Sequence, residues 1–277
     1  MTTLYATDLD GTLLGADARL SPYTVAEFRR LTAAGANITF ITARTPATVE
    51  PIMAEISPRI PAVVMTGAAR WDFASRSYQH VTYLPPVHAR AILDACHATG
   101  VNPFIYTLPR GTNTIVVYHN APLLTPVEHS FVTDRTLNDL KTFHLHTPAP
   151  AGFENETVLF FAIGTPDSIE TTCQAIRRAT PCDARWYPDT YNPGLALLEV
   201  FAPGVSKAQG LLELKRITGA DRVVAFGDNL NDMPMLLAAD EAIVVDNAHP
   251  SVKAIATRII PPNTADSVIR HIASDYQ

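Results

Sequence analysis

An apolar segment near the start of the chain, Leu4 to Leu9, leads into the stretch Asp8-Leu9-Asp10-Gly11-Thr12-Leu13. A short apolar run of this kind is typical of a buried strand in a parallel sheet. Because side chains alternate along a strand, Asp8 and Asp10 are expected to point the same way. Open α/β sheets bind ligands at the carboxyl ends of their strands, and two carboxylates this close favour a bound cation or a shared proton.

Gly11 permits a sharp turn after these carboxylates and exposes backbone N–H groups to an anion. The alternative is a polar strand end capped by an ordinary Asp-Gly turn, which is common in hairpins. The whole run, placed directly after an apolar strand, favours a functional site over that alternative.

The segments that follow alternate between strand and helix patterns. Apolar runs at Ile38 to Thr42 and Ala62 to Met65 are separated by helical spacing that begins at Ser21-Pro22 and at Thr45-Pro46. The alternation returns late, with a helix predicted over Lys207 to Thr218 and a strand over Arg222 to Phe226. This order predicts a doubly wound, Rossmann-like α/β core with a parallel sheet.

The middle of the chain has a different pattern, with several strand-like runs and two helical candidates, Val87 to Ala98 and Asp167 to Ala179. Proline-containing stretches at Leu84-Pro85-Pro86 and at Pro188 to Pro193 are interpreted as linkers around it. We therefore predict a catalytic core made of residues 1–82 and 193–277, interrupted by an inserted α+β domain at 83–192.

Composition excludes several classes of protein. The 277 residues hold 27 acidic and 21 basic side chains, a net charge of -6, which disfavours nucleic-acid binding. No run of about 18 apolar residues predicts a membrane span, and the N-terminus lacks the pattern of a signal peptide. Cys96, Cys173 and Cys182 form no C-x-x-C pair, so we do not expect a disulfide framework. We expect a cytoplasmic location instead.

The run Asp8-Leu9-Asp10-Gly11-Thr12 resembles the D-x-D-G-T signature of the haloacid dehalogenase-like superfamily, most of whose members are phosphatases. Thr42 in Phe40-Ile41-Thr42-Ala43-Arg44 is similar to the second motif, Lys207 to the third, and Gly227 to Asp232 to the fourth. The insertion between the second and third motifs resembles the type IIB cap of the Cof-type subfamily.

The resemblance implies a reaction through an aspartyl-phosphate. Asp8 would attack phosphorus, and Asp10 would protonate the leaving group and later activate water. Mg²⁺ would bind Asp8, the backbone carbonyl of Asp10, and Asp228, since hard oxygen ligands suit this ion. Lys207 would neutralise charge on the phosphoryl oxygens and on Asp8.

Further residues receive supporting roles from the same resemblance. Gly11, Thr42, Ala43, Arg44 and Asn231 would contact phosphate or substrate, and Asp232 would orient the metal's ligands. Arg44 is equally explained as a brace for its loop, and Asn231 and Asp232 also fit a helix start. Position 43 is Ala where close relatives usually have Gly, so its loop must avoid a positive φ.

The inserted domain is expected to choose the substrate. Arg110 to Asn113, His119 and Arg185-Trp186-Tyr187 are candidate contacts, although ordinary packing is favoured for each, as it is for His144 and His146. We predict a Mg²⁺-dependent phosphatase, monomeric or a small homo-oligomer, that acts on a small phosphorylated metabolite such as a sugar phosphate. A phosphomutase of the same superfamily and a non-catalytic phosphoacceptor or metabolite sensor are the alternatives.

Overall fold

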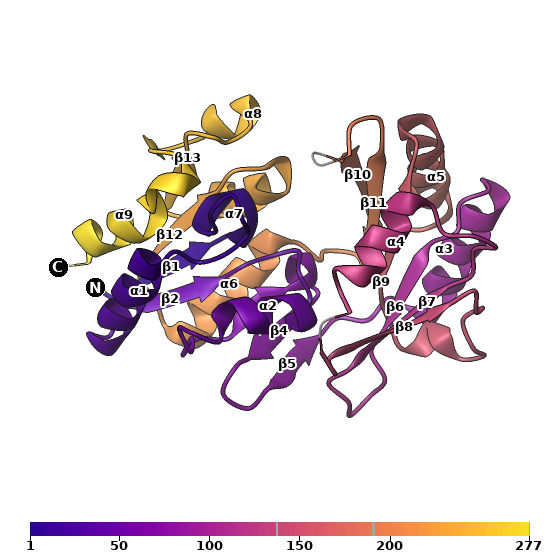
Figure 1. Cartoon of the computed structure of the whole chain (residues 1–277), viewed down its shortest axis with the longest axis horizontal. Coiled ribbons are helices and arrows are strands. Elements are labelled where there is room, and N and C mark those ends of the chain that lie inside the picture. Colours follow the sequence, from indigo (N-terminus) through magenta and orange to yellow (C-terminus); the bar gives the residue numbers. More distant parts are fainter. Residues whose placement is uncertain (137, 190–191, 277) are drawn as a thin grey trace. The chain divides into compact units, whose positions relative to one another are not determined.

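The computed structural model describes residues 1–136, 138–189 and 192–276 of the chain (Figure 1). They form two compact units. Residues 1–80 with 206–277 make one, here called the core unit, and residues 81–205 make the other, here called the cap unit. The core unit is thus built from both ends of the chain, and each unit contains a sheet of its own.

Five parallel strands form the main sheet of the core unit, in the order β14-β13-β12-β1-β2. They are β1 (Thr3–Thr7), β2 (Asn37–Phe40), β12 (Arg222–Gly227), β13 (Glu241–Val245) and β14 (Arg258–Ile260). The connection from β1 to β2 runs in one direction across the sheet and that from β12 to β13 in the other. Right-handed crossovers of this kind place their helices on opposite faces of a sheet, and the carboxyl ends of the strands where the order reverses, here β1 and β12, are where such sheets bind ligands.

Helices cover both faces of this sheet. They are α1 (Pro22–Ala33), α2 (Pro46–Met53), α6 (Lys207–Thr218), α7 (Met233–Ala238), α8 (Pro250–Lys253) and α9 (Ser267–Asp275). Helix α1 packs against α9, and α6 packs against α7. The start predicted for α1 is confirmed: Ser21 accepts a hydrogen bond from the Thr24 backbone N–H, and Pro22 occupies the first turn.

The third predicted strand is shorter than expected and leads into an antiparallel ribbon. Strand β3 (Ala62–Val64) continues the parallel sheet only through a bridge between Ile41 and Val63. It then pairs with β4 (Ala69–Asp72), which pairs with β5 (Ser77–Val81). Met65, predicted to end the strand, lies instead in a left-handed turn directly after it.

The cap unit is a six-stranded sheet with the order β10-β11-β9-β6-β7-β8, antiparallel except for the parallel pair β7–β8. Its elements are α3 (Pro86–Ala98), β6 (Phe104–Thr107), β7 (Ile115–His119), α4 (Pro126–Thr133), β8 (Lys141–Leu145), β9 (Thr157–Gly164), α5 (Pro166–Ala179), β10 (Asp183–Pro188) and β11 (Ala196–Phe201). Helices α3 and α5 pack together and against β9, while Phe131 of α4 stacks on Phe161 at 4.8 Å. Strand β9 is consequently buried along most of its length.

The predicted C-terminal boundary of the inserted domain differs from the structure. Residues 193–205, predicted to belong to the core, lie in the cap unit because β11 pairs with β9 and β10. The interpretation of Pro188 to Pro193 as a linker is therefore wrong for its described residues: Pro188 is the last residue of β10 and pairs with Ala196, so Pro188 and Pro193 lie within the β10–β11 hairpin. Residues 190–191 of this stretch lie outside the described residues. This sequence pattern does not identify a domain boundary, because proline and asparagine mark turns inside a domain as well as between domains.

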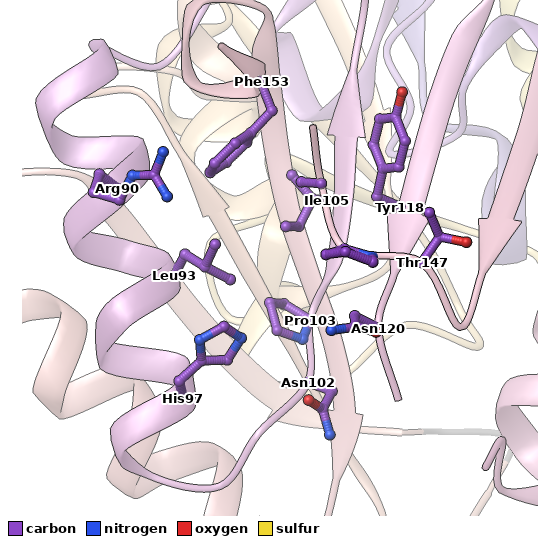
Figure 2. A pocket seen from close by; sticks show the side chains of 12 residues that line it. Arg90, Leu93, His97, Asn102, Pro103, Ile105, Tyr118, Asn120, Thr147 and Phe153 are labelled. Carbon is purple, nitrogen blue, oxygen red and sulfur yellow. The ribbon is translucent and has the colours of Figure 1, made fainter. Parts of the chain in front are cut away.

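The cap unit contains a cavity of about 170 Å³ between α3 and the strands β6 and β7. Figure 2 shows Arg90, Leu93 and His97 of α3 facing Pro103 and Ile105 across it. None of the residues predicted to carry the chemistry lines this cavity. Among the residues described here, no helix is long and apolar enough to cross a membrane.

Candidate active site

The predicted nucleophile follows the central strand β1. Asp8 continues the ladder to β12, since its backbone N–H donates to the carbonyl of Phe226 at 3.0 Å. The chain then makes a tight turn over Leu9–Leu13 in which Gly11 has φ +74°. A Cβ at Gly11 would lie 2.5 Å from the Asp228 carboxylate, so only glycine allows this turn to approach the end of β12 so closely.

Asp8 and Asp10 do not share an environment. Asp8 is buried, whereas the Asp10 side chain is 39% exposed and pairs with the guanidinium of Arg44. The two residues do not alternate on a strand as predicted, because β1 ends at Thr7, Asp8 precedes the turn and Asp10 lies within it. The guanidinium donates to both carboxylate oxygens of Asp10, with its Nε 2.7 Å from Oδ2.

Lys207, the first residue of α6, lies at the centre of the site. The helix begins there because Ser206 caps it, accepting a hydrogen bond from the Gln209 backbone N–H. The Lys207 side chain is fully buried, and its Nζ lies 2.6 Å from a carboxylate oxygen of Asp8 and 2.6 Å from one of Asp232. Burial lowers the pKa of Lys207, but the charges of Asp232 and Asp8 outweigh burial and hold the pKa above its ordinary value.

Asp232 joins Lys207 to the loop after β12. One of its oxygens accepts from Nζ, and the other accepts from the backbone N–H groups of Asp228 and Asn229, each at 3.0 Å. The interpretation of Asp232 as a positioning residue thus agrees with its contacts, although its side chain makes no hydrogen bond to the start of α7. Asn231 is half-buried beside it, and its contact with phosphate stays a prediction.

Asp228 lies opposite Asp8 and has a partner that sequence reasoning did not identify. Thr12 donates its hydroxyl to Asp228 Oδ1 at 2.8 Å, which orients the carboxylate. Burial, reinforced by the charge of Asp232, raises the pKa of Asp228 to about 6. Burial also raises the pKa of Asp8 well above its ordinary value, although the Lys207 ammonium opposes this. Thr12 belongs to the D-x-D-G-T run, but no role was predicted for it from the sequence.

These carboxylates fit a hard cation. Oxygens of Asp8, Asp228 and Asp232 all lie within 4.8 Å of one another. Both oxygens of Asp232 are already engaged, so Asp8 and Asp228 are the side chains that could hold the ion and Asp232 would position them. A cation would offset the negative charges of Asp8 and Asp228, whose pKa values are raised chiefly by burial.

The loop after β2 brings Thr42 and Arg44 to the same edge of the core sheet. The Thr42 hydroxyl oxygen accepts a hydrogen bond from the Arg44 backbone N–H at 3.2 Å, which leaves the hydroxyl hydrogen available to a ligand. Ala43 is not among the residues with positive φ, so the expectation for this departure from the family pattern is confirmed. The guanidinium of Arg44 holds Asp10, which agrees with a bracing role.

A contact of the Leu9–Leu13 turn with the residues after β13 was also not predicted. Asn247 donates its side-chain amide to the carbonyl of Gly11 at 2.8 Å and so braces the turn from the end of β13. Its neighbour Asp246 pairs with Lys253 and is exposed.

The candidate residues of the cap unit make packing contacts. Arg110 stacks on Tyr83 with its guanidinium 4.5 Å from the ring centre, and the Arg185 guanidinium donates to the Val205 carbonyl at 3.1 Å. His119 is buried and stacks on Phe104 with 3.9 Å between ring centres. The rings of His144 and Tyr118 stack, and His146 is hydrogen-bonded to the carbonyl of Ala121.

Comparison with known proteins decides the family. A family model described as haloacid dehalogenase-like hydrolase matches residues 5–272. The chain belongs to this family. Its enzyme class follows, a phosphoric monoester hydrolase of the haloacid dehalogenase type, and the predictions of family, fold class and enzyme class are confirmed.

Relatives with known names match over nearly their whole length. The chain is 25% identical over 285 residues to pyridoxal phosphate phosphatase YbhA of Escherichia coli (strain K12), covering 99% of this chain and 98% of that protein. It is 26% identical over 278 residues to 5-amino-6-(5-phospho-D-ribitylamino)uracil phosphatase YitU of Bacillus subtilis (strain 168), covering 97% and 96%. The solved structure of the subclass IIB sugar phosphatase BT4131 matches with a TM-score of 0.75 at 21% identity over 99% of both chains, which supports the fold.

Proposed function

We propose that this protein is a Mg²⁺-dependent phosphatase that hydrolyses a small phosphorylated metabolite through an aspartyl-phosphate on Asp8. The observation that carries the proposal is the placement of Asp8: a buried carboxylate at the carboxyl end of β1, 2.6 Å from the Lys207 ammonium and close to Asp228. A phosphoryl group is a dianion that repels a carboxylate, so positive charge at this position is what the reaction requires.

Mg²⁺, when bound, would neutralise charge on the phosphoryl oxygens and on the nucleophile. Asp8 and Asp228 would hold it, together with the backbone carbonyl of Asp10. Thr12 supports this arrangement, because its hydrogen bond fixes the Asp228 carboxylate. Asp232 holds the loop before it through the N–H groups of Asp228 and Asn229.

The chain's own groups then divide the reaction into two steps. In the first, an Asp8 oxygen forms a bond to phosphorus while the bond from phosphorus to the leaving oxygen breaks, and Asp10 gives that oxygen its proton. In the second, Asp10 takes a proton from water, whose oxygen attacks phosphorus and releases Asp8 and inorganic phosphate. Lys207 stabilises charge in both steps, and the Thr42 hydroxyl, the Ala43 N–H, Gly11 and Asn231 bind the phosphoryl oxygens.

Asp10 must change partners to do this. In the structure both of its oxygens accept hydrogen bonds from Arg44, so protonation of the leaving oxygen requires one oxygen of Asp10 to part from the guanidinium. The remaining hydrogen bond would keep the carboxyl group oriented. Arg44 therefore serves the reaction through Asp10, and a contact of Arg44 with substrate would be additional.

The substrate class is proposed from the named relatives. YbhA and YitU are named for pyridoxal phosphate and a phosphoribitylamino-uracil, which are small phosphorylated metabolites. We extend that class, sugar phosphates included, to this chain. A cytoplasmic location forms part of the proposal and is supported by three buried cysteines without disulfides.

Hydrolysis of p-nitrophenyl phosphate tests this function. The protein should release phosphate with Mg²⁺ and stop when the metal is chelated, and Asp8→Asn should abolish turnover in a folded protein. Asp246→Asn, which changes an exposed carboxylate paired with Lys253, is the matched control and should retain activity. Full activity of Asp8→Asn would contradict the proposed nucleophile, while isomerised product that depends on a bisphosphate activator would indicate a phosphomutase.

A further inference from the structure

A left-handed turn of three residues follows β3 in the core unit. Met65, Thr66 and Gly67 have φ values of +50°, +58° and +110°. Left-handed backbone is uncommon for residues other than glycine and is most unfavourable for β-branched side chains such as threonine. Such conformations persist only where the surrounding contacts hold them, and they cluster at functional sites.

One side of the turn is hydrogen-bonded to the loop that carries Thr42 and Arg44. The Met65 N–H donates to the carbonyl of Arg44 at 2.9 Å, and the Thr66 N–H donates to the carbonyl of Thr42 at 3.0 Å. Thr66 is 1% exposed, and its hydroxyl has no hydrogen-bond partner among the described residues. The residue is therefore held through its backbone, at some cost to its side chain.

The other side of the turn touches the start of α6. A Cβ built at Gly67 would lie 2.2 Å from the carbonyl oxygen of Ser206 and 2.7 Å from its carbonyl carbon. Ser206 caps α6 and directly precedes Lys207, so the Gly67 backbone rests against the peptide that places this lysine. Only glycine permits the approach.

We propose that the turn Met65–Thr66–Gly67 is a positioning element of the active site, which sets the separation between the Thr42–Arg44 loop and Lys207. No strand pairing among the described residues joins the Thr42–Arg44 loop to the start of α6, and the turn contacts both. Its left-handed backbone lets two successive N–H groups face the loop after β2 while the glycine faces α6. This inference rests on the proposed function for its catalytic consequence, but the contacts themselves do not depend on it.

Gly67→Ala tests the proposal by pushing the two loops apart. Ordinary contacts of a Cβ are 3.4–4 Å, so a clash at 2.2 Å requires the turn or Ser206 to move by about 1 Å. A misplacement of about 1 Å costs on the order of 100-fold in rate, and we expect this loss in kcat with little change in KM. Gly219→Ala is the matched control, since Gly219 has φ +64° at the other end of α6 but has no atom within 4 Å of its Cβ position.

A second readout does not require turnover. The chain has four lysines, so ¹⁵N-lysine labelling gives few side-chain ammonium resonances, and the one missing in Lys207→Met identifies Lys207. We expect Gly67→Ala to shift this resonance and Gly219→Ala to leave it in place, while both lower the thermal midpoint.

An unshifted Lys207 resonance with wild-type kcat in Gly67→Ala would overturn the positioning role, as would equal loss of kcat in the two alanine variants. An inactive wild-type protein would refute the proposed function alone. The Lys207 resonance would then decide the positioning role by itself.

Discussion

Replacing Lys207 by methionine removes the ammonium group that lies between Asp8 and Asp232. The change keeps most of the apolar stem of the side chain but leaves two buried carboxylates without their shared partner. Breaking a buried ion pair in this way typically costs about 3–5 kcal/mol.

The pH dependence gives this prediction a signature. Without Lys207 the group that lowers the pKa of Asp8 is lost, so the folded-state pKa rises further above the unfolded value. A carboxyl group with a raised folded pKa favours the folded state below the unfolded pKa, and that contribution is lost as the pH rises through the folded pKa. The cost of Lys207→Met should therefore be smaller at pH 5 than at pH 7.

Urea unfolding of the core unit measures this cost. The chain has two tryptophans, and Trp71 is buried in the core unit, so a Trp186→Phe background restricts the fluorescence signal to that unit. Lys215→Met is the control: it lies on the same helix, and its pair with Asp240 is partly exposed, so its cost should stay below about 1 kcal/mol. Equal decreases in the free energy of unfolding for the two methionine variants would contradict this prediction. So would a decrease for Lys207→Met that does not change with pH.

Three further perturbations probe other contacts. Arg44→Lys removes the paired hydrogen bonds from the guanidinium to Asp10, and kcat should fall about tenfold or more. The loss of kcat should be larger for alkyl phosphates than for p-nitrophenyl phosphate, and equal losses for the two substrates would contradict a role of Arg44 through the general acid. Thr12→Val removes the hydrogen bond to Asp228, so activity should require about 10–100-fold more Mg²⁺, and an unchanged Mg²⁺ titration would count against this site. Burial lowers the pKa of His119 below 6.5, so its contribution to stability is complete above pH 6.5 and is lost as the pH falls; His119→Asn should flatten this acid dependence in urea unfolding, and an unaltered profile would show that other groups cause it.

The positions of the motifs could be predicted because parallel strands end at one edge. Asp8 follows β1, Thr42 follows β2 and Asp228 follows β12, and these strands are neighbours in the sheet. Knowing that each run was a strand of one parallel sheet was enough to expect these side chains at a common edge. Lys207 needed the resemblance as well, since a lysine at a helix start is otherwise an ordinary surface residue.

The pairings inside the site could not be predicted. The bond from Arg44 to Asp10 joins residues 34 apart, and that from Asn247 to Gly11 joins residues 236 apart, so no local spacing encodes them. The exit of the chain from the cap unit was misplaced for a related reason. Strand β11 belongs to the cap unit because it pairs with β9 and β10. The prolines that precede it in the sequence are equally compatible with a strand that stays in the cap sheet and with one that begins the next domain.

Chemical trapping of the phosphoenzyme tests the central claim most directly. Enzyme quenched in acid during turnover with Mg²⁺ and a phosphate ester is treated with borohydride, which reduces an acyl phosphate to the alcohol, and its peptides are mapped by mass spectrometry. We predict homoserine at position 8, dependent on substrate and Mg²⁺ and absent from Asp8→Asn. Unmodified Asp8 in enzyme that is quenched while product is forming, together with a reduced residue at another position, would contradict Asp8 as the nucleophile.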